Sequence, residues 1–381
     1  MLTMILHARR GRATVTSVAA TVAAGAAAAR AMLTTFAAGA AVATIAALAA
    51  LIASAAQAAE ADYVAAAEKE GQVVVFGDLN AVPALAVGFQ AKYPKVKLVT
   101  TSGDAWQLLT RFMNERAAGR AVLDVFFLAE DVVTTADNAG ALAPFKADAW
   151  KALPPSSLPS KNGTFALGNI GVMMLAWNRD GMTKRPLPKD WLDFANPPKE
   201  WDGMIAISNP ASSSATFSVF AALYQNYGPD KAGTILQGFK RAKTEPTASI
   251  GVQNTKVQTG ERPLAFFMNS STIGILRAQG TPIDFAVPAS GAIAQSNAVA
   301  ITANAPHPNA AKLFVEYALG EEGQKLLVQK NLYPARGGLP PPSGMPAFGE
   351  IKLMPLDLGK ALKERDQILA WWQAQTGFAP K

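Results

Sequence analysis

Residues 71–131 read GQVVVFGDLNAVPALAVGFQAKYPKVKLVTTSGDAWQLLTRFMNERAAGRAVLDVFFLAED, and the order of apolar and polar segments in this stretch decides the fold. Short runs that are wholly apolar at 73–76 and 125–129, and apolar except for Lys97 at 96–99, are each followed by small or acidic residues. Continuous apolar runs of this length are typical of parallel strands that are buried on both faces. Between them, apolar residues recur at helical spacing. The alternation of strand, helix, strand, helix, strand predicts an α/β fold with a mainly parallel sheet covered by helices.

Polar side chains follow each of these three predicted strands. Asp78 and Asn80 follow the first, Ser102 and Asp104 follow the second, and Glu130 follows the third. In open α/β sheets, ligands bind outside the carboxyl ends of the strands. These five residues are therefore candidate ligand-binding residues, and an acid among them suits a ligand amine. The competing interpretation is that they are solvated helix caps, which is the commoner case.

The second half of the chain repeats the alternation after a change of pattern. An extended segment near 168–178 reads as a strand leaving the first domain, and further strands and helices follow up to about residue 290. Helices are predicted at 214–226, 230–241, 250–260 and 271–279. The chain then continues through another strand into C-terminal helices and a loop rich in Pro and Gly. About 320 residues after residue 58 are more than one domain usually needs.

The N-terminal segment reads as an export signal. Residues 31–59 carry no charge, four arginines and no acid lie upstream, and Ala56-Gln57-Ala58 has the small-x-small pattern of a signal-peptidase site. We therefore expect residues 1–58 to be a cleaved signal peptide and the protein to be periplasmic. The alternative is an uncleaved membrane anchor, because the apolar run is long enough to span a bilayer. Translation from Met32 would remove the positively charged part of the signal.

Composition excludes several classes of function. Without residues 1–58 the chain keeps 31 of its 35 basic residues and all 28 acidic ones, a net charge of +3, so nothing favours binding to nucleic acid. It has no cysteine, which excludes disulfides and a lipid-anchored lipoprotein, and only His307 remains of two histidines. Catalytic triads that use histidine or cysteine and histidine-rich metal sites are therefore not expected. We expect no enzyme activity, no metal and no cofactor.

Four stretches resemble the type-2 periplasmic binding proteins that deliver solutes to ABC transporters, and in particular the ferric-ion-binding and related extracellular solute-binding proteins. The stretches are EGQVVVFGDLN with FQAKYPKVKLVTTSGD, LDVFFLAED with GALAPF, DWLDFANPPKEWDGMIAISNP, and APHPNAAKLFVEYALGEEGQKLL. Together they cover nearly all of the chain after the signal segment. The resemblance implies two α/β lobes, each a mainly parallel sheet flanked by helices, joined by crossover strands that act as a hinge.

The resemblance also implies a domain division and partners. We expect lobe 1 to comprise residues 59–167 and 291–381, with lobe 2 inserted as residues 168–290. The protein is expected to be a monomer that receives a small molecule in the cleft between the lobes. Its partners are expected to be an ABC permease and ATPase in the inner membrane.

The sequence after the predicted strand 204–208 is the favoured ligand site. It reads Asn209-Pro-Ala-Ser-Ser-Ser-Ala-Thr216 and precedes a predicted helix. The free N–H groups and the dipole at a helix start favour an anion, which Ser213, Ser214 and Thr216 would help to bind. The alternative is an ordinary N-cap without a ligand. The resemblance favours the ligand, because similar receptors place an anion at the start of this helix.

A second candidate is Asn269-Ser270-Ser271. In the iron-binding relatives a pair of adjacent tyrosines occupies the matching place, and neutral serines are poor ligands for ferric ion. We expect these three side chains to donate hydrogen bonds to a solute, with helix capping as an equal alternative. Ser249, Tyr333 and Arg336 are weaker candidates, and Arg336 would suit a carboxylate or phosphate.

These observations predict a receptor for a small anionic organic solute, namely a phosphonate, a phosphate ester or a carboxylate. A ferric-ion or ferric-chelate receptor is the first alternative, and its only tyrosine candidates are Tyr224, Tyr227, Tyr317 and Tyr333. A receptor for a polyamine or thiamine, using the acids that follow the strands, is the second. An exported enzyme on the same fold is the third, but no paired-carboxylate or nucleophile motif supports it.

Overall fold

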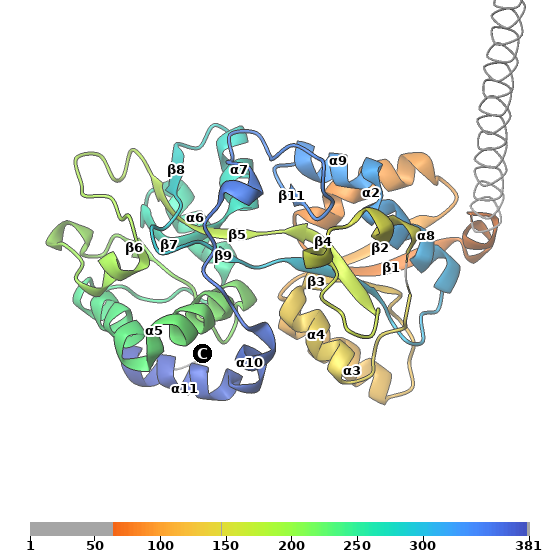
Figure 1. Cartoon of the computed structure of the whole chain (residues 1–381), viewed down its shortest axis with the longest axis horizontal. Coiled ribbons are helices and arrows are strands. Elements are labelled where there is room, and N and C mark those ends of the chain that lie inside the picture. Colours follow the sequence, from red (N-terminus) through yellow and green to blue (C-terminus); the bar gives the residue numbers. More distant parts are fainter. Residues whose placement is uncertain (1–63, 146, 379–381) are drawn as a thin grey trace, which may run out of the picture. The chain divides into compact units, whose positions relative to one another are not determined.

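The computed structural model describes residues 64–145 and 147–378. The predicted signal peptide, residues 1–58, lies outside the described residues. From Val64 onward the chain forms one compact unit that contains two separate β-sheets, and the cartoon in Figure 1 shows one sheet around β1–β4 and the other around β5–β8.

The first sheet confirms the strands predicted from residues 71–131. β1 (Gln72–Gly77) lies between β2 (Lys97–Ser102) and β3 (Val125–Ala129), parallel to both, with Phe76 paired to Thr101 on one side and to Phe126 on the other. Three antiparallel strands extend this sheet in the order β11-β4-β10-β3-β1-β2; they are β4 (Phe165–Ile170), β10 (Asn297–Ile301) and β11 (Tyr333–Pro334).

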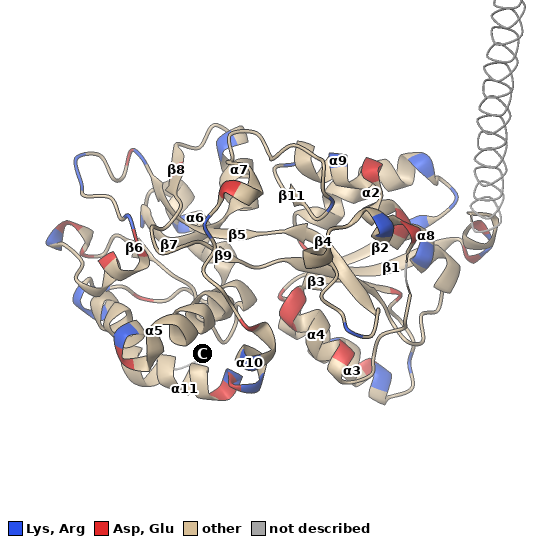
Figure 2. Ribbon diagram, in the orientation of Figure 1, with Lys and Arg blue, Asp and Glu red and all other residues tan. Residues whose placement is uncertain are grey.

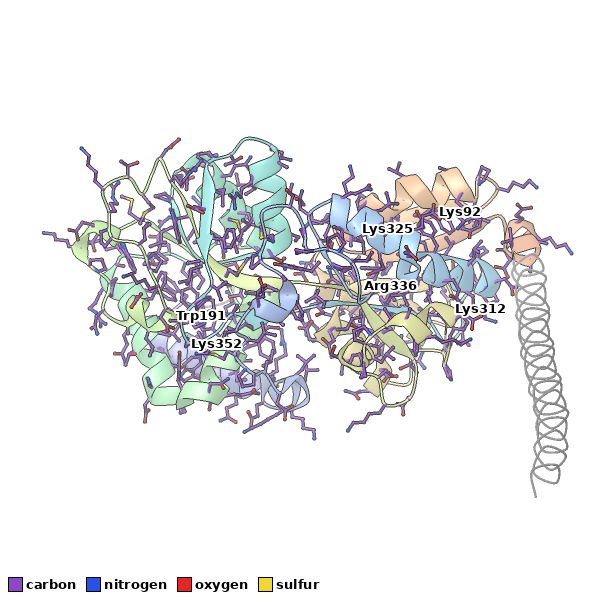
Figure 3. All side chains as sticks on the ribbon, turned by 45° about the horizontal axis from the view of Figure 1, so that its top comes forward. Lys92, Trp191, Lys312, Lys325, Arg336 and Lys352 are labelled. Atoms are coloured by element: carbon purple, nitrogen blue, oxygen red, sulfur yellow. The ribbon has the colours of Figure 1, made fainter. Side chains whose placement is uncertain are left out.

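The second sheet has the order β6-β7-β5-β8, with β9 also paired to β5. Its strands are β5 (Val172–Asn178), β6 (Ile205–Ala206), β7 (Leu264–Asn269), β8 (Ile283–Ala286) and β9 (Ile293–Ala294). An aromatic core packs against this sheet, and in it Phe266 of β7 contacts Trp191, Phe194 and Phe220. Trp191, labelled in Figure 3, is fully buried, and its indole N–H donates to the carbonyl of Gly291, so it packs in the core of the protein.

Two neighbouring segments connect the sheets. β4 runs into β5 through Gly171, and β9 runs into β10 through Gln295 (Figure 1). The two linking residues exchange backbone hydrogen bonds, with N···O distances of 3.1 Å and 2.9 Å. A Cβ atom on Gly171 would lie 2.4 Å from the carbonyl oxygen of Gln295, so the close approach of the two crossovers requires glycine at this position.

Helices cover both sheets, and the C-terminal ones differ from the expected division. Residues 291–381 were assigned to the first lobe, yet α10 and α11 pack against α5, where Ala361 and Ile368 contact Phe217 and Ala221. The division into lobes otherwise stays a prediction.

The bounds of the helices are as follows: α2 (Ala81–Lys92), α3 (Ala105–Ala117), α4 (Glu130–Asn138), α5 (Ser214–Arg241), α6 (Ile250–Thr259), α7 (Ser270–Ala278), α8 (Pro308–Leu319), α9 (Glu321–Gln329), α10 (Leu358–Lys363) and α11 (Arg365–Thr376). Short 3-10 turns lie at Asp148–Ala152, Pro155–Ser157, Trp191–Ala195, Lys199–Trp201 and Phe348–Glu350.

The two helices predicted at 214–226 and 230–241 are the two parts of α5. They meet at Gly228, whose φ of 77° interrupts the helix, and Pro229 follows it. Proline is tolerated here because it begins a new helical segment rather than interrupting one.

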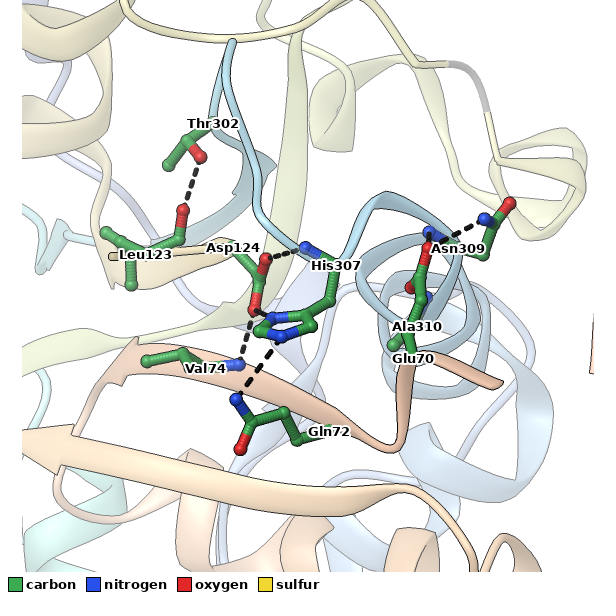
Figure 4. A network of polar contacts seen from close by, with 9 residues as sticks. All are labelled: Glu70, Gln72, Val74, Leu123, Asp124, Thr302, His307, Asn309 and Ala310. Atoms are coloured by element: carbon green, nitrogen blue, oxygen red, sulfur yellow. Dashed lines mark hydrogen bonds and ion pairs between the residues drawn. The ribbon is translucent and has the colours of Figure 1, made fainter. Parts of the chain in front are cut away.

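His307 has a structural role at the amino-terminal side of the first sheet (Figure 4). The buried carboxylate of Asp124 accepts hydrogen bonds from the backbone N–H of Val74 at 2.7 Å and of His307 at 2.7 Å. The Nδ1–H of His307 donates to the same carboxylate at 2.9 Å, and its Nε2 accepts from the amide of Gln72 at 3.2 Å. This network joins β1, the chain before β3 and the start of α8.

Candidate functional site

The acids that follow β1 and β2 act as turn and helix caps. Oδ1 of Asp78 accepts from the backbone N–H groups of Asn80 at 2.9 Å and Ala81 at 2.7 Å, and Asp104 accepts from Gln107 at 3.0 Å at the start of α3. Burial raises the pKa of Asp78, against the opposing effect of these hydrogen bonds. Asn80 precedes α2 without capping it through its side chain, and Ser102 is exposed at the end of β2.

The start of α4 carries two adjacent acids (Figure 2). Burial, with the charge of Asp131 as a second cause, raises the pKa of Glu130 to about 7. Asp131 is 2% exposed, and burial raises its pKa as well. Its Oδ1 accepts from the N–H of Val132 at 2.9 Å, but its buried Oδ2 has no hydrogen-bond partner among the described residues. The sequence analysis selected Glu130 and missed Asp131.

The start of α5 leaves part of its backbone N–H groups without an acceptor among the described residues. Ser213 is the N-cap and accepts from the N–H of Thr216 at 3.2 Å, while the N–H of Phe217 donates to the carbonyl of Ser213. Two of the first four N–H groups are thereby bonded, and those of Ser214 and Ala215 have no acceptor within the described chain. The hydroxyl of Thr216 is fully buried and bonds to that of Ser208, so it faces the interior rather than the helix start.

A hydrogen bond connects the two helix starts. The hydroxyl of Ser214 donates to Oδ1 of Asp131 at 2.6 Å and accepts from Nε2 of Gln295 at 2.9 Å. Gln295 lies in the second crossover, between β9 and β10. The contact therefore joins this crossover to α4, which follows β3 of the first sheet, and to α5, which follows β6 of the second sheet. Asp131, Ser214 and Gln295 thus form one polar group at the junction of the two sheets.

Arg365, at the first position of α11, joins this group from the C-terminal part of the chain. Its guanidinium carbon lies 4.6 Å from the ring centre of Trp106 in α3 and 5.5 Å from that of Phe217 in α5. Its Nη2 is 3.5 Å from the carbonyl oxygen of Ala211, and its charge favours the ionised form of Asp131. Its buried Nε has no partner in the described part of the chain. Sequence reasoning missed Arg365, because nothing near it in the chain marks a site.

A pocket of about 340 Å³ adjoins the acids of α4. Its polar lining includes Glu130, Asp131, Gln295, Ser296 and, one helical turn beyond Ser214, Ser218. The rest of the lining is mainly apolar and comes from the crossover strands and from residues 348–358. No lysine or arginine is among its lining residues. The pocket is therefore acidic at one end and apolar elsewhere.

The residues at the start of α7 bond mainly to one another. Oδ1 of Asn269 accepts from both the N–H and the hydroxyl of Ser271 at 3.0 Å, and the fully buried hydroxyl of Ser270 accepts from the N–H of Val172 at 3.3 Å. These contacts hold the first crossover against α7. Ser249 likewise caps α6, accepting from Val252 at 3.3 Å.

The hydrogen bonds of Tyr333 and Arg336 go to residues outside the polar group at the starts of α4 and α5. The buried Tyr333 donates its hydroxyl hydrogen to the carbonyl of Pro346 at 2.7 Å, and burial raises its pKa to about 12. Arg336, labelled in Figure 3, lines a second hollow of about 270 Å³ beside the loop rich in Pro and Gly, which shares Ser156, Ile170 and Phe348 with the pocket of about 340 Å³. Whether any of the predicted site residues binds a ligand stays a prediction.

Among residues 64–145 and 147–378, no helix is long and apolar enough to cross a bilayer.

A family model described as bacterial extracellular solute-binding protein matches residues 121–366. An uncharacterized protein of Haemophilus influenzae is 26% identical over 161 residues, which are 41% of this chain and 45% of that protein, so the match spans less than half of that relative. Iron uptake protein A1 of Synechocystis is 26% identical over 297 residues, 73% of this chain and 81% of that protein.

The solved structures show the same fold. The periplasmic binding protein AfuA of Actinobacillus pleuropneumoniae, determined with fructose-6-phosphate bound, matches with a TM-score of 0.73 at 22% identity, over 81% of this chain and 99% of that chain. The predicted two-lobed periplasmic binding protein fold is therefore confirmed. The expectation of mainly parallel sheets is wrong, because most strand pairs in both sheets are antiparallel: β10 reverses direction against β3 and β4, and β5 against β7, β8 and β9. The chain belongs to the bacterial extracellular solute-binding protein family.

Proposed function

We propose that this solute-binding protein is the extracytoplasmic receptor of an ABC importer and binds a small anionic organic solute, such as a phosphonate, a phosphate ester or a carboxylate. The observation that carries the proposal is the start of α5, where the N–H groups of Ser214 and Ala215 have no acceptor in the described chain. In this proposal the receptor performs no covalent chemistry and delivers the loaded form to a permease and ATPase complex.

The electrostatics of the helix start support an anion. Unpaired N–H groups and the helix dipole together favour negative charge at this position. Arg365 adds a full positive charge near Ala211 and Phe217, within a turn of the same helix start. A guanidinium group supplies several donors in a planar array that matches phosphate and carboxylate oxygens. The sugar phosphate bound by AfuA is a solute of the proposed chemical class.

The tyrosine positions weigh against the alternative of a ferric-ion receptor, which Iron uptake protein A1 suggests by name. Tyr317 contacts Phe89 and Tyr93 at the α2–α8 contact, and Tyr224 packs on Trp371 of α11. Tyr333 bonds to a backbone carbonyl, and burial raises its pKa and that of Tyr317 to about 12. Ferric ion requires anionic oxygen donors that converge on one point, whereas Tyr224, Tyr317 and Tyr333 lie on α5, α8 and β11.

Calorimetric titration of the purified protein tests the proposal. The panel contains phosphate esters, phosphonates, carboxylates, ferric citrate, spermidine and thiamine. A ligand at 100 times its dissociation constant adds about 2.7 kcal/mol to the free energy of unfolding, so a parallel melting experiment reports the same binding. Binding of an anionic class, weakened in Ser213→Ala, is the expected result. Binding of ferric citrate, spermidine or thiamine alone contradicts it.

A further inference from the structure

The polar group at the junction of the two sheets contains several donors and one acceptor that have no partner among the described residues. The donors are the N–H groups of Ser214 and Ala215 and the Nε of Arg365. The acceptor is Oδ2 of Asp131, which is buried without a partner in residues 64–145 and 147–378, although Oδ1 of the same carboxylate is 2.6 Å from the hydroxyl of Ser214. One hydrogen bond therefore separates the proposed anion position from a buried carboxylate.

Glu130 adds a second carboxyl group beside Asp131. Glu130 precedes Asp131 on α4, and both line the pocket of about 340 Å³, to which no lysine or arginine contributes. The positive charge of Arg365 opposes the raised pKa of Asp131, and the repulsion between the two acids contributes to the raised pKa of Glu130. A solute with negative charge alone would bring a third anion into this group, and like charges repel strongly where water is excluded.

We propose that the solute carries an ammonium group as well as its anionic group, with the anion at the start of α5 and the ammonium at Glu130 and Asp131. This inference rests on the proposed function, because it uses the same anion position. The ammonium donates to Oδ2 of Asp131 and restores charge balance beside Glu130. The apolar wall of the pocket, which includes Leu167 and Leu356, contacts the carbon atoms of the solute. The class is therefore a small zwitterion, such as an amino acid, an aminoalkyl phosphonate or an aminoalkyl phosphate ester.

Matched ligand pairs test the proposal on the full-length chain by calorimetric titration. The pairs are 3-aminopropylphosphonate with propylphosphonate, ethanolamine phosphate with ethyl phosphate, and 4-aminobutyrate with butyrate; propylamine is the amine without an anion. The expected result is that at least one amino compound binds ten times or more tighter than its partner. In Glu130→Gln the ratio of the two affinities within that pair should fall at least fivefold, and Asp131→Asn should also lower this ratio.

The controls separate failure of this inference from failure of the proposed function. Asp230→Asn removes an exposed acid in the distal part of α5 and should leave the ratio within a pair unchanged. Equal binding of both members of every pair overturns the zwitterion while the anionic receptor stands. Propylamine binding as tightly as the amino compounds overturns both proposals, as does the absence of binding by every compound that carries an anionic group, the amino compounds included. If Asp131→Asn does not fold, Glu130→Gln alone decides the outcome.

Discussion

The hydroxyl of Ser214, the first residue of α5, donates a hydrogen bond of 2.6 Å to the carboxylate of Asp131, the second residue of α4. The two residues lie on helices that follow strands of different sheets, and both are at least 93% buried. The bond therefore connects the two halves of the fold at the place where the proposed solute binds. Several measurable properties depend on it.

Ser214→Ala should lower the free energy of unfolding by about 1–3 kcal/mol. The substitution removes the donor to Asp131 and leaves a buried carboxylate with one backbone donor from Val132. Urea denaturation followed by circular dichroism measures the change. Ser343→Ala, at an exposed loop serine, is the matched control and should change the free energy by less than about 0.5 kcal/mol. A Ser214→Ala protein as stable as the control would show that the bond contributes nothing.

Arg365→Met should weaken binding of the anionic solute about tenfold or more, equivalent to roughly 1.4 kcal/mol. The side chain volume is retained beside Trp106 and Phe217, whereas the positive charge near the start of α5 is lost. Arg365→Lys should recover part of the affinity, because lysine keeps the charge without the planar donor array. Titration calorimetry gives both values, with the exposed Arg120→Met as control. An unchanged affinity in Arg365→Met would remove Arg365 from the site.

The free energy of unfolding should fall as the pH rises from about 4.5 towards 7, because of the raised pKa of Glu130. Its pKa in the folded protein is raised to about 7 from 4.5, because burial disfavours the charged form. The protonated form is thus retained in the folded state, and its stabilising effect is fully present below pH 4.5 and is lost as the pH rises through 7. By linkage the change is on the order of 3 kcal/mol.

Melting temperatures of the wild type and of Glu130→Gln across pH 4.5–8 check this expectation. The variant should lack this part of the pH dependence, so the difference between the two proteins should grow with pH. Parallel curves for the two proteins would contradict the raised pKa. Asp148→Asn, at an exposed acid, provides the comparison.

Asp124→Ala should destabilise the fold by about 3–5 kcal/mol. The fully buried carboxylate accepts from the N–H of Val74 and from both the N–H and the ring of His307, and its loss leaves these donors buried without partners. Denaturation in urea measures the loss, and Asp230→Asn should show almost none. Because the network lies at the amino-terminal side of the first sheet, the affinity of the folded fraction for the solute should not change.

The local pattern of the chain was enough to predict most of the fold. The apolar run Val73–Phe76 and the polar residues after it predicted β1 and its carboxyl end, since a buried parallel strand needs apolar side chains on both faces. Ser213 before an apolar helix predicted the start of α5, since its hydroxyl bonds a free N–H of the first turn. The packing of α11 against α5 was not predicted, because helices 124 residues or more apart in sequence show no local sign of their contact.

For the site, the polar helix starts and strand ends could be read from the chain alone, because capping and strand burial depend on neighbouring residues. This reading identified Ser213, Ser214 and Glu130 as candidates. Which of these residues meet depends on the packing of distant elements. Asp131 approaches Ser214 because two crossovers bring the sheets together, and Arg365 approaches Trp106 because the chain returns 259 residues later to pack on α5. Contacts between distant segments depend on how whole elements pack, and no pattern within a single element contains that information.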